Sequence, residues 1–218
     1  MCARATRRPV GWVAHLYHLA PMGTQNGKPG RPRDPHADEA ILAAARDLLA
    51  EGGLANLTVE GTAQRAGVAK TTVYRRYPTK LDLAVAAVAD LVSGGGPESD
   101  SVENGVREGS DLFQKAFGPP GSQAAYLAVA AAAATNPDIH ERFTRDVLTP
   151  VSHDIEAMVR DARERGHARP DAPADFIFDV ILGTLIHRYI IRQLPPDPEF
   201  LERLTSLTWF LYQGCPRD

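Results

Sequence analysis

The sequence predicts an all-α protein, and three observations support this fold class. Apolar residues recur at helical spacing in most segments, and no stretch sustains the apolar–polar alternation of a strand. Proline and glycine clusters separate these segments, as they do between packed helices. The chain has 218 residues, 44% hydrophobic and 23% charged. This balance allows a substantial buried core and excludes a wholly disordered chain or a coiled-coil rod.

Capping residues mark the helix starts of the first half. Asp34 suits an N-cap, where its carboxylate accepts backbone hydrogen bonds, and Pro35 suits the first helical position. Thr58 also fits an N-cap, and Thr79 with Asp82 resembles a capping box. The expected helices run from 34 to the glycine pair at 52–53, from 58 to about 66, from 70 to 76, and from 79 to about 92.

A segment rich in glycine and acidic residues, 94–101, is the clearest boundary in the chain. We therefore expect a first domain of residues 34–93 and a C-terminal domain of residues 94–218, preceded by an extension of residues 1–33. Further helices are expected near 102–117, 122–135, 138–166 with a bend at Pro150, 173–194 and 197–213.

Charge is divided unevenly along the chain. Residues 1–90 contain 12 Lys and Arg against 8 Asp and Glu, whereas residues 91–218 contain 12 against 19. A basic first part indicates that this part meets a polyanion. Cys2 and Cys215 lie at opposite ends, which favours a reducing, cytoplasmic compartment. No apolar run reaches the roughly 20 residues that a membrane crossing needs.

The segment 58–77, TVEGTAQRAGVAKTTVYRRY, carries the main functional signal. A small residue and a turn glycine, Ala63 and Gly67, allow two helices to cross closely as a helix-turn-helix requires. On the second helix, Ala69 and Val73 are expected to point inward. The opposite face presents Lys70, Thr71, Tyr74 and Arg75. Such groups suit base edges and phosphates in a DNA major groove, although an ordinary solvated helix has a similar composition.

Residues 37–91 resemble the DNA-binding domain of the tetracycline-repressor family. The motifs that agree without a gap are Ile41–Ala45, Leu48-Leu49, Gly52-Gly53, Leu57–Val59, Ala63, Ala66–Val68, Thr72–Lys80 and Leu83. The resemblance implies a recognition helix at 70–76 and sequence-specific binding to double-stranded operator DNA. It implies DNA contacts by Thr58, Lys70, Thr71, Thr72, Tyr74, Arg75, Tyr77 and Lys80. One departure is Ala69, which stands where the family often has a capping serine.

The residues before the first helix have two parts. Residues 1–21 interrupt their apolar stretch with histidine and tyrosine and carry no clean cleavage site, so we interpret them as a disordered extension rather than an export signal. A mobile tail and translation from Met22 both fit this extension. Lys28, Arg31 and Arg33 then form a basic arm that is expected to reach the minor groove or neighbouring phosphates, although a plain solvated tail has the same composition.

The last two expected helices are apolar around most of their circumference, so other protein segments must pack against them on two sides. In the resembled family the last two long helices pair with their copies, which implies a homodimer. The segment Ile181–Tyr189 also resembles one common C-terminal subtype of the family. A buried helix of a monomer is the alternative.

Six side chains are candidates for lining an effector cavity, and ordinary core packing is the alternative for each of them. They are Phe113, Phe117, Tyr126, Phe143, Met158 and His187. His187 lies in an apolar run, where a hydrogen-bonded core histidine is common. The expected ligand is a small, largely apolar molecule of unknown identity.

We therefore interpret the chain as a homodimeric, ligand-responsive transcriptional regulator, with a repressor as the favoured form. No cofactor is expected, and no metal, because His15 and His18 lack further ligand residues nearby. A constitutive DNA-binding protein without a ligand is the main alternative. A helical enzyme is disfavoured because Ser152, His153 and Asp154 diverge by about 100° each on a helix and cannot form a relay.

Overall fold

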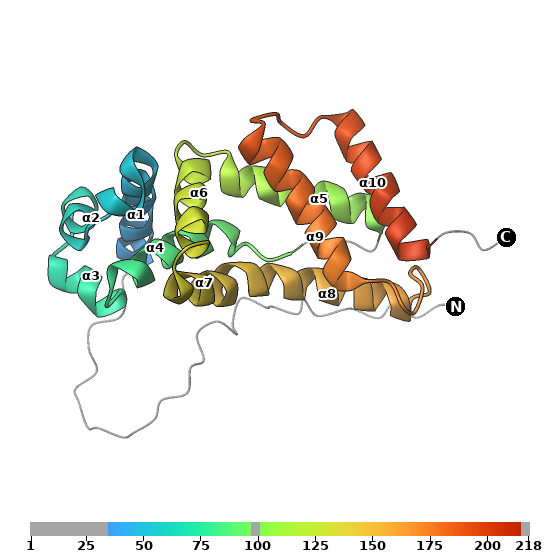
Figure 1. The fold of residues 1–218 in the computed structure, drawn as a ribbon, viewed down its shortest axis with the longest axis horizontal. Coiled ribbons are helices and arrows are strands. Elements are labelled where there is room, and N and C mark those ends of the chain that lie inside the picture. Colours follow the sequence, from blue (N-terminus) through green and yellow to red (C-terminus); the bar gives the residue numbers. More distant parts are fainter. Residues whose placement is uncertain (1–34, 97–100, 215–218) are drawn as a thin grey trace, which may run out of the picture. The chain divides into compact units, whose positions relative to one another are not determined.

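The computed structural model describes residues 35–96 and 101–214, and all regular structure in these ranges is helical (Figure 1). The all-α prediction is therefore confirmed. The first range contains α1 (Pro35–Asn56), α2 (Val59–Arg65), α3 (Lys70–Arg76) and α4 (Lys80–Ala89), followed by a 3₁₀ turn (Asp90–Val92). The second range contains α5 (Val102–Phe117), α6 (Ser122–Ala133), α7 (Pro137–Phe143), α8 (Thr149–Glu164), α9 (Ala174–Leu185) and α10 (Pro198–Gln213).

The apolar stripe of α1 forms the core of the first four helices. Ile41 and Ala45 are buried against α2 and α4, and Val73 of α3 is buried in the same core with 0% of its surface exposed. The helix is distorted at Gly53, whose φ of 64° lies in the left-handed region that favours glycine. The predicted N-cap Asp34 lies outside the described residues.

Two of the predicted caps are present, whereas α3 begins without a side-chain cap. The Gly61 amide donates to Thr58 Oγ1 at 2.9 Å. Thr79 and Asp82 form a reciprocal capping box, with each backbone amide donating to the other side chain. Ala69 precedes α3 in an extended conformation and offers no acceptor. Ala69 is exposed, so the inward position predicted for it is wrong. The prediction assumed helical spacing between Ala69 and Val73, but the helix begins only at Lys70.

Two predicted helices are interrupted by π-helical turns. The expected 138–166 helix is divided by the turn Thr144–Leu148, one turn before Pro150. Proline lacks an N–H and its ring crowds the carbonyl four residues earlier, so the wider turn accommodates it. The expected 173–194 helix continues from α9 into a π-helical turn, Ile186–Ile191, and ends there. Gln193 follows with a left-handed φ of 52°.

The second range packs directly against the first. α6 contacts α1 and α4, and α7 contacts α4. Ion pairs join the same elements: Arg142 of α7 contacts Asp82 of α4, and Arg46 of α1 contacts Asp90 at 2.7 Å. None of the described helices is both long and apolar enough to cross a membrane.

A serine at position 69 should stabilise the fold. Ala69 already has the extended backbone of an N-cap, so Ala69→Ser adds an acceptor for the first amides of α3 without a backbone change. We expect the free energy of unfolding to rise by about 0.5–2 kcal/mol in chemical denaturation. Ala69→Val, which adds no acceptor and is as poor an N-cap as alanine, serves as the control. A serine variant no more stable than the valine variant would contradict this account.

Candidate nucleic-acid interface and effector cavity

The turn between α2 and α3 fixes the crossing of these two helices. Gly67 adopts a φ of 67°, and the Val68 amide donates to the Ala63 carbonyl at 3.0 Å. Ala63 is buried at this crossing, where its small side chain lets the helices approach closely. The geometry is that of a helix-turn-helix with α3 in the second, recognition position.

Helix α3 presents its predicted polar face to the surface. Lys70, Thr71, Tyr74 and Arg75 are exposed, whereas Val73 is buried on the opposite side. Tyr74 leaves 47% of its surface exposed, which is unusual for a large aromatic side chain. The face therefore combines two cations, a hydroxyl group and an aromatic ring in reach of a ligand.

Arg76 has a different role from its neighbour Arg75. Its Nε lies 2.5 Å from Asp38 Oδ1, and only 10% of the Arg76 side chain is exposed. A half-buried ion pair between α3 and α1 holds the recognition helix on the core. Arg75 forms no ion pair with any described residue and extends from the surface.

An acidic residue of α2 lies beside the exposed face of α3. Glu60 Oε1 is 3.2 Å from Lys70 Nζ, and both side chains are exposed. A backbone hydrogen bond and the Lys70 ammonium together lower the pKa of Glu60. The carboxylate is therefore ionised at neutral pH and competes with any anion for Lys70.

The other predicted DNA contacts lie around this face with varied exposure. Thr58 is exposed at the start of α2. Thr72, Tyr77 and Lys80 are partly buried. Arg31 and Arg33 lie outside the described residues, as does the rest of the predicted arm.

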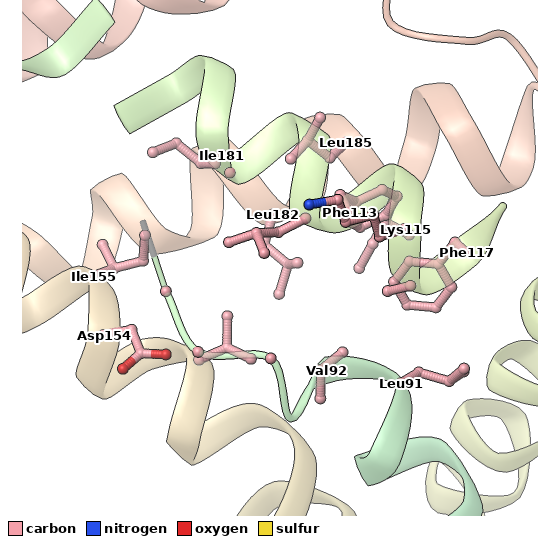
Figure 2. Close-up of a pocket in the computed structure, with 18 of the residues that line it drawn as sticks. Leu91, Val92, Phe113, Lys115, Phe117, Asp154, Ile155, Ile181, Leu182 and Leu185 are labelled. Atoms are coloured by element: carbon pink, nitrogen blue, oxygen red, sulfur yellow. The ribbon is translucent and has the colours of Figure 1, made fainter. Parts of the chain in front are cut away.

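A cavity of about 470 Å³ lies between the turn after α4 and helices α5, α8 and α9 (Figure 2). Leu91 and Val92 line it from the turn, and Phe113 lines it from α5. Ile155 of α8 and Leu182 of α9 form further parts of the wall. The wall is mainly apolar, as in sites that bind small organic molecules.

Four of the six predicted cavity residues line this space: Phe113, Phe117, Tyr126 and Met158. The aromatic rings among them form a chain of contacts, with centroids 4.5 Å apart for Phe113 and Phe117 and 5.2 Å apart for Phe117 and Tyr126. Burial raises the pKa of Tyr126, which keeps this phenol neutral. Phe143 is buried beyond the cavity wall, with its ring 5.7 Å from that of Tyr126.

The sixth candidate, His187, is exposed, so the expectation of a core or cavity histidine is wrong. It follows the buried Leu185 by two positions, which places it on the other side of the helix. An apolar run on a helix that is apolar on two sides does not show which side faces the core.

Sequence reasoning missed Asp154 and the contribution of α9 to the cavity. Asp154 lies on the stripe of α8 that also contains Val151, Ile155 and Met158, all of which line the cavity. An acidic residue in an otherwise apolar helical register was the available signal. The excess apolar residues of α9 predict a covered surface, and three of them, Ile181, Leu182 and Leu185, line the cavity.

The ends of α9 and α10 expose large apolar side chains. These are Phe176, Ile191 and Leu194 from α9 and the segment after it, and Leu207, Trp209 and Phe210 from α10. α9 and α10 are in contact, so these side chains belong to neighbouring elements (Figure 1). Such an accumulation is typical of a surface that another protein covers.

The helix-turn-helix with an exposed basic recognition face defines a DNA-binding protein, and comparisons with known proteins identify the family. Residues 41–87 match the model of bacterial regulatory proteins of the tetR family, and residues 97–208 match the tetracyclin repressor-like C-terminal domain. The chain therefore belongs to the tetracycline-repressor family of transcriptional regulators, a family of regulators rather than enzymes.

Relatives agree with this assignment over most of the chain. The HTH-type transcriptional regulator Rv1556 of Mycobacterium tuberculosis is 28% identical over 182 residues, which cover 81% of this chain and 89% of the relative. The regulator EthR of the same species is 30% identical over 153 residues, covering 66% and 69%. The crystal structure of the TetR family regulator SCO0332 superimposes with a TM-score of 0.60 at 27% identity, covering 83% of this chain and all of that chain.

Removing the Glu60 carboxylate should strengthen DNA binding. Glu60→Gln releases Lys70 and removes a negative charge next to the recognition helix. We expect binding to random duplex DNA to tighten by about two- to fivefold and to depend more steeply on salt. Fluorescence anisotropy at several salt concentrations measures both. Glu51→Gln is the control, because Glu51 pairs at 2.7 Å with Arg65 of α2 and not with a residue of α3. Unchanged affinity and salt dependence would contradict a DNA interface at Lys70.

Proposed function

We propose that this regulator is a homodimeric repressor that leaves a palindromic operator when a small, largely apolar molecule occupies the cavity. One observation carries the proposal. The same cavity is lined by Leu91 and Val92, directly after α4, and by residues of α8 and α9. α4 packs on α1 beside the helix-turn-helix, so a ligand in the cavity contacts the connection to the DNA-binding helices.

In this proposal the two domains and the residues of α3 have separate roles. Residues 34–93 form the DNA-binding domain, and residues 94–218 form the regulatory and dimerisation domain. Lys70, Thr71 and Arg75 read base edges, because they are exposed on α3. Thr72 and Tyr74 contact bases or phosphates from the same helix, whereas Thr58, Tyr77 and Lys80 contact phosphates at its margins.

Residues before α1 add non-specific affinity in this proposal. Arg31 and Arg33 contact the minor groove or adjacent phosphates through their guanidinium groups. These contacts strengthen binding to any duplex, as basic arms do in other helix-turn-helix proteins. The protein acts in the cytoplasm, where its DNA target is found.

The dimer forms through the apolar surface of α9 and α10. Two copies related by a two-fold axis bury Phe176, Leu207 and Phe210 from both partners. A two-fold protein presents two recognition helices and reads two half-sites of opposite orientation. This is the reason to expect a palindromic operator.

The ligand acts by selecting a conformation. The protein has one conformation whose recognition helices fit the operator and another whose helices do not. The ligand releases the operator only to the extent that it binds the second conformation more tightly than the first. Arg142–Asp82 and Arg46–Asp90 tie the start of α4 and the turn after it to neighbouring helices, so α4 transmits a displacement as a unit. Arg46 and Asp90 themselves line the cavity.

Two cationic residues should separate sequence reading from general affinity. An operator is first selected from a random duplex pool by the purified protein. We expect Arg75→Ala to lose about 1–3 kcal/mol of discrimination between operator and random DNA. We expect Lys80→Ala to weaken binding to both DNAs equally and to reduce the salt slope by about one. Equal loss of specificity in both variants would contradict this assignment of roles.

An acidic residue in the exposed α10 surface should prevent dimerisation. Phe210→Glu places a charge where the proposal buries an apolar side chain. We expect sedimentation equilibrium at micromolar concentration to show a monomer with at least about tenfold weaker operator binding. Leu127→Glu changes an exposed apolar residue of α6 in the same way and should remain dimeric. A dimeric Phe210→Glu variant, or a monomer with full operator affinity, would contradict the proposed interface.

A further inference from the structure

Asp154 is the acidic residue of the cavity wall that has no hydrogen bond or ion pair within the described ranges 35–96 and 101–214. It lies on α8 between Val151 and Ile155, and its side chain is half-buried. Figure 2 shows its carboxylate beside the segment that follows Val92. Burial raises the pKa of Asp154, an effect that the exposed His153 next to it opposes. A partly desolvated carboxylate that accepts no hydrogen bond and forms no ion pair is energetically unfavourable.

The other charged groups of the wall are compensated or hydrated. Arg46 pairs with Asp90 at 2.7 Å, so these two charges largely cancel. Lys115 is exposed to solvent and extends from α5, on the opposite wall from Asp154 (Figure 2). Among the described residues that line the cavity, Asp154 is therefore the partly buried charge without an ion-pair partner, and its charge is negative.

We infer that the cavity takes an apolar molecule bearing a positively charged amine, and that the ammonium group of this molecule pairs with Asp154. The inference rests on the proposed function, since it specifies the chemistry of the effector. An ammonium supplies the counter-charge and hydrogen-bond donors that the carboxylate lacks. The apolar wall around Phe113 and Leu182 receives the hydrocarbon part. An apolar carboxylate of the same size would instead be repelled by Asp154.

The position of Asp154 also relates charge recognition to the DNA-binding helices. Gly94–Gly96 line the cavity after the turn that ends α4. A Cβ added to Gly96 would lie 2.5 Å from Asp154 Cβ, so the chain passes directly over this residue. An ammonium group bound at Asp154 therefore sits next to the segment that leads from α4 into the regulatory domain.

Three probes that share one alkyl chain test the inference: decylammonium, decanoate and decanol. Isothermal titration of the full chain measures their affinities, and anisotropy of labelled operator measures release. For the unmodified protein we expect decylammonium to bind about tenfold more tightly than decanol, and decanoate to bind more weakly than decanol. Asp154→Asn should bind decylammonium and decanol equally. It should fold normally, because it removes an uncompensated charge, and thermal unfolding checks this.

Glu156→Gln is the matched control, since Glu156 is an exposed acid on the same helix outside the cavity wall. It should keep the preference for decylammonium. Equal binding of decylammonium and decanol to the unmodified protein, tighter binding of decanoate, or an unchanged preference in Asp154→Asn overturns the inference but leaves the effector cavity standing. Failure of all three probes to bind overturns the inference together with the effector part of the proposed function. Operator recognition and dimerisation are judged separately by the Arg75, Lys80 and Phe210 variants.

Discussion

The burial of α4 from all sides is the constraint on which the rest of the structure depends. Leu83, Val85 and Val88 are each buried, and Ala84 and Ala87 on the intervening faces are buried as well. A helix without a polar face requires partners around its whole circumference. α1 covers one side, and α6 and α7 cover another. The DNA-binding helices and the regulatory helices therefore share one core. A displacement of the helices in one part consequently changes the packing of the other part.

The sequence was sufficient for the features that have local causes. The caps at Thr58 and Thr79, the apolar stripe of α1 and the exposed face of α3 each follow from spacing within a few residues, and the structure confirms them. The π-helical turn after α9 could not be predicted, because a segment that is apolar on two sides hides the change of face that an extra residue causes. The exposure of His187 and the position of Asp154 depend on which helices surround α8 and α9, and this tertiary information is absent from local periodicity.

Two adjacent arginines of α3 have different roles: one holds the helix on the core, and the other is exposed to solvent. Consecutive positions on a helix diverge by about 100°. Arg76 is thereby directed at Asp38 of α1, whereas Arg75 is directed outward. With only seven residues and no side-chain cap, α3 has little intrinsic stability. Val73 and the Arg76–Asp38 pair supply the tertiary contacts that hold the helix in place, and the exposed residues on its other face are left for a partner.

Helix α9 likewise has one side that packs within the protein and another that is exposed. Ile181, Leu182 and Leu185 line the cavity, whereas Phe176 and Ile191, which lies in the π-helical turn after α9, are exposed. Folding alone favours burial of every large apolar side chain and a partner for every half-buried charge. Exposed apolar side chains and half-buried charges without a partner often mark functional sites. The exposed rings of α9 and α10 are examples, and so is the carboxylate of Asp154, which has no ion pair or hydrogen bond among the described residues. A molecule that fills the cavity consequently contacts the helix that carries the proposed dimer surface as well as the turn after α4. In the proposed dimer, occupancy would act on the spacing of the two recognition helices through both contacts at once.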